Sequence, residues 1–554
     1  MAKDNELVFC PLGGVGEIGM NFALYGFGPS SRREWLIVDV GVTFPDPTLP
    51  GVDLVLPDTR FIESQIEQVR GIVITHAHED HYGALLDLWP KLKAPVWMTP
   101  FAAGMLEAKR VSDNVRVQPT INIYKAGERF DVGPFEIEAV AVTHSVPEPV
   151  SLAIRTPLGT VIHTGDWKLD PAPTLPPMTD ENRFREIGAE GVTALVCDST
   201  NAMREGDSPS EEAVSHGIRE VIEKAPGRVA ITTFSSNVGR IRSIAEAARD
   251  AGRQVLVMGR SLKRVIDVAG ELGYMEGLPP FLLEEDYGYI PRENVVVLCT
   301  GSQGEPRAAL AKLARDEMKH VALTAGDMVV FSSRVIPGNE KAILEIKNQL
   351  IEQGIKIVED GDALVHVSGH PRRSELLRMY GWVKPRILVP VHGEAAHLVA
   401  QGSLGASAGI PEIAQVRNGD MIRLAPGAAE IVDTVPFGRL MKDGRVIGSE
   451  EETGVRDRRK LSFAGHVVLN LVLDDRYDLA GDPDIVAIGV PETDARGKPM
   501  EDIMLDAAIG AVESVPRARR KDLDLMSEAA RRAVRSAANE AWGKKPIVTV
   551  FVTR

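Results

Sequence analysis

The chain has 554 residues and a formal net charge of −15, and 44% of its residues are hydrophobic and 25% charged. The length is too great for one ordinary core and predicts about three or four domains, while the composition is that of a folded soluble protein. The negative charge argues against a protein that coats nucleic acid non-specifically, but not against a nucleic-acid enzyme whose positive charge is confined to a channel.

Membrane and secretory signals are not found in the sequence. No apolar run approaches the ~20 residues that would span a bilayer, and the first six residues lack the basic and apolar regions of a secretory signal. The only cysteines, Cys10, Cys197 and Cys299, are scattered and odd in number, which excludes a disulfide framework and a CxxC zinc site. We expect a cytoplasmic protein without membrane contact.

The first motif is rich in glycine and follows a predicted strand at 7–11. Gly14, Gly16 and Gly19 fit the dinucleotide-binding pattern GxGxxG, and Asp39 lies 20 residues further on. That fold requires a helix to begin at the glycines, but residues 21–27 and 35–41 read as two further strands. We therefore reject a dinucleotide fold and predict a three-stranded meander. The glycines then form a turn at its rim, and Asp39 orients groups beneath a nearby site.

The densest cluster of chemical groups is HxHxDH, formed by His76, His78, Asp80 and His81. It follows the apolar run 71–74 and precedes a helical pattern, and a strand end is the usual place for ligands in α/β proteins. Imidazole and carboxylate are the ligands of catalytic zinc. Because a quarter of the 12 histidines fall within six residues, a solvated polar loop is a poor explanation. One tight loop of this kind can serve two neighbouring metals.

Further metal-type side chains follow other predicted strands. A single polar residue at a strand end carries no information, but a series of them predicts a site along one edge of a sheet. Asp166 is suited to bridge two cations, because a carboxylate has two oxygens. The metal-type residues at the ends of predicted strands are His144, Asp166, Asp198, His370 and His392. The strand that leads to His370 is predicted at 364–369.

Between Asp198 and His370 the pattern changes to regular strand–helix alternation, which predicts a parallel α/β unit inserted into the metal-binding domain. Its loops 235–237 and 300–304 present hydroxyls and backbone amides before a helix, an arrangement that suits phosphate. Helix N-capping explains each loop equally well. The predicted strands are 229–234, 254–258, 295–300, 328–332 and 355–358, with helices starting near 238, 262, 306 and 338.

After His392 we expect a helix to about residue 401, a turn at 418–420 and a glycine-rich, charged linker at 436–459. From residue 461 the order strand–strand–helix–helix–strand predicts a small α+β module for assembly or RNA contact. The basic clusters 456–460 and 517–521 are consistent with either a solvated face or a contact surface.

The order of these motifs resembles the metallo-β-lactamase superfamily, and the α/β insert resembles that of the β-CASP nucleases. The segments 11–21, 197–201, 366–370 and 390–394 are together similar to the bacterial ribonuclease J family, and the resemblance covers the whole chain. It implies an α/β fold: a metallo-β-lactamase αββα sandwich with an inserted β-CASP parallel α/β domain and a small α+β C-terminal domain. The implied ranges are 1–205 and 355–430 for the sandwich, 206–354 for the insert, 431–460 for the linker and 461–554 for the last domain.

The resemblance also implies a role for each site residue. His76, His78 and His144 would hold one zinc ion, Asp80, His81 and His392 a second, and Asp166 would bridge both. Asp80 would also orient the attacking hydroxide, and Asp198 matches the first acid of the β-CASP motifs. His370 would stabilise the pentacovalent phosphate or protonate the leaving 3′ oxygen. A pocket for the 5′ phosphate and the scissile region would consist of Ser235, Ser236, Asn237, His366, Val367, Ser368, Gly369 and His370.

The implied function is that of a zinc-dependent ribonuclease with two zinc ions per subunit. It would degrade 5′-monophosphorylated single-stranded RNA in the 5′→3′ direction and cut internally, in RNA maturation and decay, and the sequence does not rank these activities. A homodimer or homotetramer and RNA-decay complex partners are also implied. Two departures from the family bear on this expectation. Residues 371–373, Pro-Arg-Arg, are basic where the family is usually small, and 444–454 leaves open any extra structural cation site.

Three rival interpretations fit the sequence less well. A hydrolase of small esters, of the glyoxalase or lactonase type, has no use for the long insert. A DNA-processing β-CASP enzyme is disfavoured by the ribonuclease-like motifs and the C-terminal module. An RNA-binding scaffold with a decayed metal site would lack ligands, whereas all seven are present.

Overall fold

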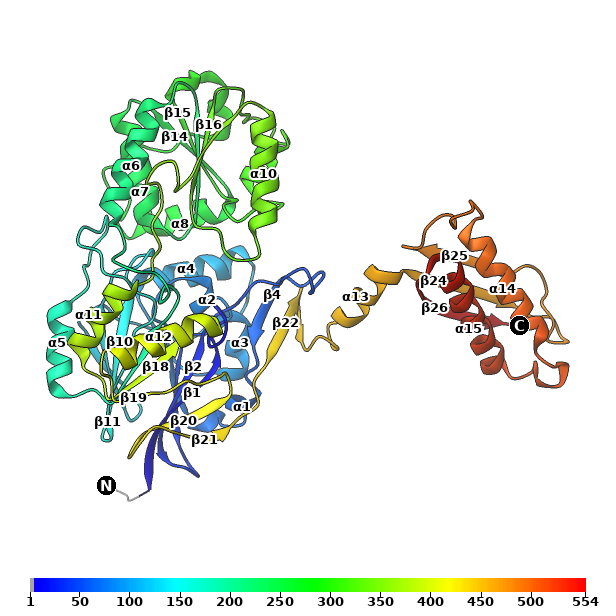
Figure 1. Ribbon diagram of the computed structural model, residues 1–554, viewed down its shortest axis with the longest axis horizontal. Coiled ribbons are helices and arrows are strands. Elements are labelled where there is room, and N and C mark those ends of the chain that lie inside the picture. The colour runs from blue at the N-terminus through cyan, green and yellow to red at the C-terminus, as the bar shows by residue number, and fades with distance from the viewer. Residues whose placement is uncertain (1–3) are drawn as a thin grey trace. The chain divides into compact units, whose positions relative to one another are not determined.

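The computed structural model describes residues 4–554, which form two compact units (Figure 1). The first contains residues 4–43 and 55–439, and the second contains 44–54 and 440–554. No helix among residues 4–554 combines the length and apolar character needed to cross a membrane.

The first unit is built on an eight-stranded sheet that begins with the predicted meander. Strands β1, β2 and β3 pair antiparallel in chain order, and the glycine motif forms the turn between β1 and β2. Gly14, Gly16 and Gly19 all have positive φ, a conformation that glycine adopts without steric cost. No helix begins at these glycines, which confirms the rejection of a dinucleotide fold. In spatial order the strands are β21 (Glu430–Thr434), β20 (Asp420–Ala425), β1 (Asn5–Gly13), β2 (Phe22–Pro29), β3 (Glu34–Val38), β5 (Val69–Val73), β6 (Val96–Met98) and β7 (Ile121–Ile123).

A seven-stranded sheet packs face to face against the first. Their shared core contains Phe9, Tyr25 and Val38 from one sheet and Leu152 and Val196 from the other, all essentially inaccessible to water. Burial of alternate residues on both inner faces is what holds such layers together. The second sheet runs in the order β19 (Glu412–Ile413), β18 (Ile387–Val391), β12 (Ala194–Asp198), β11 (Gly159–His163), β10 (Val150–Thr156), β9 (Phe135–Ala141) and β8 (Arg129–Val132).

Helices cover the outer faces and complete an αββα sandwich, as the resemblance implied (Figure 1). A second core joins the outer face of the seven-stranded sheet to α5, α11 and α12 through residues such as Phe184, Met379 and Leu404. The short strand β4 (Leu54–Pro57) follows β3. The helices of the sandwich are α1 (Arg60–Glu63), the 3₁₀ turn η1 (Ile66–Gln68), α2 (Glu79–Tyr82), α3 (Leu85–Leu92), α4 (Pro100–Ser112), α5 (Glu181–Glu190), α11 (Arg373–Val383) and α12 (Ala395–Ser407).

The insert is a parallel five-stranded sheet with helices on both sides, as predicted. Its strands follow the order β14 (Gln254–Met258), β15 (Val295–Cys299), β13 (Val229–Thr233), β16 (Met328–Ser332) and β17 (Lys356–Val358). Continuous β-branched and apolar runs suit strands that are buried on both faces. Its helices are α6 (Glu211–Lys224), α7 (Val238–Asp250), α8 (Arg260–Glu271), α9 (Ala309–Ala314) and α10 (Glu340–Glu352), with 3₁₀ turns η2 (Glu284–Tyr289) and η3 (Arg292–Asn294).

The predicted strand at 364–369 is wrong, because these residues belong to no sheet. Side chains of the insert satisfy its backbone in place of a neighbouring strand. The carbonyl of Val365 accepts hydrogen bonds from Arg240 Nη1 at 3.1 Å and from Ser332 Oγ at 2.7 Å. The segment therefore runs as an ordered connection along the end of β16, and this places His366 to His370 between the insert and the sandwich.

The second unit contains a small α+β module, whose strands and helices follow one another along the chain in the predicted order. Its three-stranded sheet has the order β25 (Asp484–Ile488), β24 (His466–Val472) and β26 (Ile547–Thr553). The helices α14 (Met500–Ser514) and α15 (Leu523–Trp542) contribute Met504, Val512, Met526 and Val534 to its core. The 3₁₀ turn η4 (Arg517–Arg519) lies between them.

The stretch 436–459, expected as a linker, is more ordered than predicted. It carries β22 (Arg439–Asp443) and β23 (Val446–Gly448), which pair as a hairpin, and the start of α13 (Val455–Ala464). Its acids are neutralised by arginines: Glu450 pairs with Arg459, and Glu451 with Arg456 at 3.2 Å. Within residues 4–554, no cluster of metal-type ligands occurs in this stretch. The second basic cluster is also partly neutralised, since Arg517 and Arg520 pair with Asp478.

A buried ion pair fixes α7 of the insert against the start of α6. Arg240 and Glu211 are 1% and 5% exposed, and Arg240 Nη2 lies 2.7 Å from Glu211 Oε2. Removing one partner of such a pair leaves an uncompensated buried charge, at a cost of about 3–5 kcal/mol. We therefore predict that Arg240→Met markedly lowers the thermal midpoint for unfolding of the insert, measured by calorimetry. The control Arg219→Met breaks the exposed pair with Asp250 and should cost no more than about 1 kcal/mol. Equal shifts for the two variants would contradict this account.

Candidate metal centre

Seven histidine and aspartate side chains predicted from the sequence converge at one end of the two large sheets. They come from the loop after β5 and the short helix α2 that follows it, from the loops after β9 and β11, and from the loop after β18. Their ligand atoms form two sets. Within each set all ligand atoms lie within 4.8 Å of one another, and Asp166 belongs to both sets. The first set is His76, His78, His144 and Asp166, and the second is Asp80, His81, His392 and Asp166.

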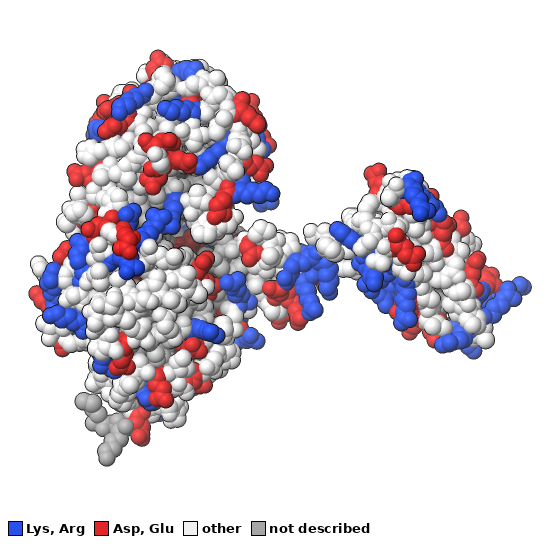
Figure 2. Space-filling model, in the orientation of Figure 1, with Lys and Arg blue, Asp and Glu red and all other residues white. Residues whose placement is uncertain are grey.

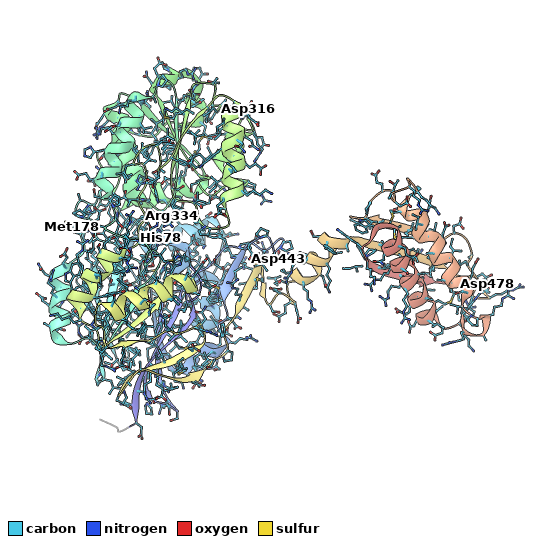
Figure 3. All side chains as sticks on the ribbon, in the orientation of Figure 1. His78, Met178, Asp316, Arg334, Asp443 and Asp478 are labelled. Carbon is cyan, nitrogen blue, oxygen red and sulfur yellow. The ribbon has the colours of Figure 1, made fainter. Side chains whose placement is uncertain are left out.

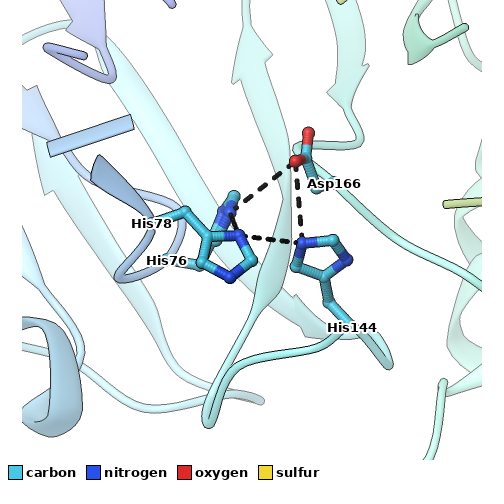
Figure 4. Close-up of side chains that lie close together, drawn as sticks. All are labelled: His76, His78, His144 and Asp166. Carbon is cyan, nitrogen blue, oxygen red and sulfur yellow. Dashed lines mark hydrogen bonds and ion pairs between the residues drawn. The ribbon is translucent and has the colours of Figure 1, made fainter. Parts of the chain in front are cut away.

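The first set brings three imidazole nitrogens and one carboxylate oxygen together (Figure 4). His78 Nδ1 lies 3.2 Å from His76 Nε2 and 3.0 Å from His144 Nε2. Asp166 Oδ2 lies 3.8 Å from His76 Nε2 and 3.6 Å from His144 Nε2. Nitrogen and oxygen atoms at these separations can be ligands of a single cation at the centre of the group.

The second set shares the same oxygen of Asp166. Its Oδ2 lies 3.3 Å from His81 Nε2 and 3.5 Å from His392 Nε2, and Asp80 Oδ2 lies 3.6 Å from His81 Nε2. The other oxygen, Asp166 Oδ1, is buried and has no hydrogen-bond partner among residues 4–554. A buried carboxylate oxygen without a partner is costly. Bound cations would remove that cost, and the donor set therefore fits a metal centre.

The protonation states also favour metal binding. Burial lowers the pKa of His78 to about 4 and lowers the pKa values of His76 and His144 well below their usual range. These rings are therefore neutral, as metal ligands must be. At His81 burial opposes the charged form, but Asp166 and the other nearby carboxylates outweigh it and raise the pKa. That part of the site attracts positive charge, which a divalent cation supplies more fully than a proton.

Hydrogen bonds to the second ring nitrogen orient the ligand histidines. His144 Nδ1 donates to the carbonyl of Gly369 at 2.6 Å, and the Asp39 carboxylate accepts from His81 Nδ1 at 2.7 Å. Such bonds fix the tautomer and direct the other nitrogen at the metal. Asp39 also accepts from the backbone amide of Thr75 at 2.8 Å, and it adopts a left-handed φ of 64°. Its position confirms the prediction that it orients groups beneath the site.

Asn21 is an orienting residue that sequence reasoning missed. Its Oδ1 accepts from His392 Nδ1 at 3.0 Å, and its Nδ2 donates to the carbonyl of Asp80 at 3.0 Å. His392 itself has a left-handed φ of 51°, and its amide donates to the carbonyl of Gly14 at 2.7 Å. The glycine turn therefore holds His392, 371 residues away from Asn21 in sequence. The sequence signal was the position of Asn21 directly after that turn, at the end of the family-like segment 11–21.

Asp198 and His370 form a hydrogen-bonded pair beside the two sets. His370 Nδ1 lies 2.7 Å from Asp198 Oδ2 and 3.9 Å from Asp166 Oδ2. Burial opposes the charged form of His370, but Asp198 and then Asp166 outweigh it and raise its pKa to about 9. The ligand-type atoms of Asp198, His370, Asp166 and His392 also all lie within 4.8 Å of one another. We interpret Asp198 and His370 as a proton-holding pair, because their short hydrogen bond already satisfies both ligand atoms.

The segments expected to contact substrate lie at the junction of sandwich and insert, and some of their groups have structural partners. Asn237 caps α7, its Oδ1 accepting from the amide of Arg240 at 2.9 Å. Ser235 and Ser236 are half-buried in the same turn, and Ser368 Oγ accepts from Asn201 Nδ2 at 3.0 Å.

Three residues of the segment before His370 differ in surroundings. Val367 is buried, and the carbonyl of Gly369 is occupied by His144. Burial lowers the pKa of His366 to about 3, and its Nδ1 is buried without a hydrogen-bond partner among residues 4–554. The structure thus brings the predicted segments together, and only part of their polar groups remains available to a ligand.

Four family models match the chain. They are the Beta-lactamase superfamily domain at residues 35–179, the Ribonuclease J beta-CASP domain at 226–350, the Zn-dependent metallo-hydrolase RNA specificity domain at 354–412 and the Ribonuclease J C-terminal domain at 453–554. Their order is that of the sandwich, the insert, the sandwich again and the C-terminal module.

Relatives match the chain from end to end. Ribonuclease J of Sinorhizobium meliloti is 65% identical over the whole chain and 98% of its own length, and Ribonuclease J of Mycolicibacterium smegmatis is 36% identical over 98% of this chain and 96% of its own. A crystal structure of a protein of unknown function from Enterococcus faecalis V583 matches 76% of this chain and all of that chain, with a TM-score of 0.52. At 15% identity this last likeness shows the fold alone. Together with the convergent ligands, the full-length similarity shows that the chain belongs to the ribonuclease J family of zinc-dependent ribonucleases.

Proposed function

We propose that this chain is a two-zinc ribonuclease that degrades single-stranded RNA from the 5′ end with a preference for a 5′ monophosphate. It also cuts internally, and it serves RNA maturation and decay. The observation that carries the proposal is the position of Asp166 Oδ2 between two histidine sets, beside the pair Asp198–His370. The name of the Sinorhizobium meliloti relative, Ribonuclease J, supports RNA as the substrate.

Each set of ligands would hold one zinc ion. His76 Nε2, His78 Nδ1 and His144 Nε2 would bind the first, and Asp80 Oδ2, His81 Nε2 and His392 Nε2 the second, with Asp166 shared. Two such ions supply Lewis acidity toward phosphate oxygens and lower the pKa of water into the neutral range.

The chain's own residues supply the remaining steps. The side chain of Asp80 is 29% exposed, against 2% for Asp166, so its carboxylate can reach the attacking hydroxide and orient it for in-line attack. His370 holds a proton whose loss Asp198 opposes, and it donates this proton to the leaving 3′ oxygen. Asp198 is in turn fixed by Thr200, whose amide and hydroxyl donate to Asp198 Oδ1 at 2.9 and 2.7 Å.

The RNA strand would run between the insert and the sandwich. Ser235, Ser236, His366 and Ser368 offer polar groups to a 5′ phosphate, while Val367 shapes the wall. Asn237 contributes by capping α7, which begins beside the pocket. Gly369 contributes through its carbonyl, which orients His144. A 5′ phosphate held one nucleotide from the metals gives stepwise release from that end, and a strand that passes beyond the pocket is cut internally.

We further propose the domain limits inferred from the sequence, 1–205 with 355–430, 206–354 and 461–554. Assembly as a homodimer or homotetramer, association with other RNA-decay proteins and action in the cytoplasm complete the proposal. The exposed apolar residues Val486, Ile488 and Phe551 of the C-terminal sheet are compatible with assembly through this module.

The proposed reaction is tested with three single-stranded oligonucleotides of one sequence: 5′-monophosphorylated RNA, 5′-hydroxyl RNA and DNA. We predict release of mononucleotides from the 5′ end, fastest for the monophosphorylated RNA and slowest for DNA. A zinc chelator should abolish cleavage, and added zinc should restore it, because the reaction depends on the metals. Equal rates on RNA and DNA, or activity that resists chelation, would contradict the proposal.

His370 is tested by its replacement with alanine. We predict that His370→Ala keeps both zinc ions, measured by elemental analysis of the purified protein. The rate of RNA cleavage should fall by about 10²–10⁴-fold because the proton donor is lost. The exposed His216 in α6 provides the control, since His216→Ala should leave both properties unchanged. A His370→Ala enzyme that cleaves RNA at the wild-type rate would exclude this role.

The positioning role of Asn21 predicts a different pattern. Asn21→Ala removes the acceptor that orients His392, so zinc affinity should fall by about 10–100-fold. Activity should return when zinc is supplied in excess, and competition titration with a zinc-binding dye measures both affinities. The matched control is the exposed Asn539 in α15. Asn539→Ala should change neither the zinc affinity nor the activity. Wild-type zinc affinity in Asn21→Ala would show that His392 needs no such support.

A further inference from the structure

Three arginines close to His370 have no acidic partner in the part of the chain that the structure describes. Arg204 follows β12, Arg334 follows β16 and Arg372 immediately precedes α11. Within residues 4–554, no carboxylate forms an ion pair with any of their guanidinium groups, although most other arginines nearby are paired. In a protein of net charge −15, an unneutralised group of cations is a local exception.

Hydrogen bonds place this cluster next to the catalytic pair. Arg334 Nη1 donates to Asn201 Oδ1 at 2.8 Å, and Asn201 Nδ2 donates to the carbonyl of His370 at 3.0 Å. The amide of Arg373 donates to the carbonyl of Arg204 at 3.0 Å, which brings the loop of Arg204 against the start of α11. Figure 3 labels Arg334 close to His78 in this view, and in Figure 2 blue side chains gather in the same region.

The strand connections of the insert reverse direction at the strand that precedes Arg334. Strands β13 and β16 are parallel neighbours, but the chain leaves β13 toward β14 on one side and leaves β16 toward β17 on the other. Open parallel sheets bind ligands beyond the carboxyl ends of the strands at such a reversal. Ser235 and Ser236 follow β13 and Arg334 follows β16, so hydroxyls and a guanidinium follow the two strands at this reversal.

The cluster is electrostatically unfavourable without an anion. Like charges repel, more strongly where water is partly excluded. At Arg334 the loss of solvent, followed by the charges of Arg204 and Arg372, lowers the pKa. An anion placed among the three side chains removes this repulsion. The planar fork of guanidinium is suited to paired hydrogen bonds with phosphate oxygens.

We propose that Arg204, Arg334 and Arg372 form a phosphate-binding site for the RNA strand, separate from the metal ligands. This rests on the proposed function, because it takes the ligand to be the substrate of the same site. The bound group is a phosphate of single-stranded RNA, either the terminal 5′ phosphate or an internal phosphodiester. Arg372, the first basic residue after His370, lies where the sequence departs from the family's usual small residues, and the proposal gives it a role in substrate binding.

The test replaces Arg334, Arg372 and Arg204 by glutamine, singly and together. Arg378→Gln is the matched control, because Arg378 lies on α11 and is exposed but already pairs with Asp207. kcat and KM are measured for one RNA with a 5′ monophosphate and with a 5′ hydroxyl, at several salt concentrations. KM should rise about tenfold for Arg334→Gln and Arg372→Gln, the effect of losing one charged hydrogen bond. The slope of log KM against log salt should become shallower by about 0.7 for each RNA phosphate that the variant no longer binds.

The outcomes separate the alternatives. A rise in KM confined to 5′-monophosphorylated RNA identifies the terminal phosphate as the ligand, and an equal rise for both RNAs identifies an internal phosphodiester. Shifts no larger than that of Arg378→Gln overturn the site. A fall in kcat at unchanged KM also overturns it, since Arg334 would then only position Asn201 and His370. Thermal unfolding measurements show whether Arg334→Gln is folded. If it is not, Arg372→Gln tests the site in its place.

Failure of the proposed function is distinguishable from failure of this site. If the wild-type enzyme does not cleave RNA, the proposed function is wrong, but fluorescence anisotropy with the labelled RNA still measures Kd for each variant. A Kd about tenfold weaker for Arg334→Gln and Arg372→Gln than for Arg378→Gln supports the site. Equal Kd values for the wild type and these three variants overturn it.

Discussion

The structure depends on the burial of one carboxylate between two groups of imidazoles. Asp166 is 2% exposed, its Oδ2 lies 3.3–3.8 Å from four imidazole nitrogens, and its Oδ1 has no hydrogen-bond partner among residues 4–554. Such an arrangement is unfavourable for the protein alone and favourable around divalent cations. The two ligand sets form one continuous site because they share the carboxylate of Asp166.

The surrounding fold positions loops that are far apart in sequence at one sheet edge. His392 and Asp39 adopt left-handed backbone conformations, which non-glycine residues maintain only where their surroundings hold them. The glycine turn before β2 supplies those restraints for His392 through Asn21, and Gly369 supplies a carbonyl to His144. The large core between the two sheets stabilises the fold and offsets the free energy of these strained conformations. The insert lies next to the same edge of the sheets (Figure 1).

Much of this could be predicted from the sequence, because strand ends and ligand types carry a local signal. The meander, the five insert strands, the C-terminal order and all seven convergent side chains required only periodicity, spacing and family motifs. The contacts of the non-local partners could not be predicted. Asn21 was noted only as the end of the family-like segment 11–21, and Arg204 and Arg334 have no distinctive spacing, so the roles of all three follow from contacts in the structure. The predicted strand at 364–369 failed for a related reason: an apolar run indicates burial, but here side chains of Arg240 and Ser332 satisfy its backbone.

The central claim is that Asp166 bridges two zinc ions. Anomalous diffraction at the zinc absorption edge from crystals of the zinc-loaded protein tests it directly. We predict two anomalous peaks, one ligated by His76, His78 and His144 and the other by Asp80, His81 and His392. Each should lie about 2.0–2.2 Å from an oxygen of Asp166. A single peak, or two peaks of which only one is within bonding distance of Asp166, would contradict it.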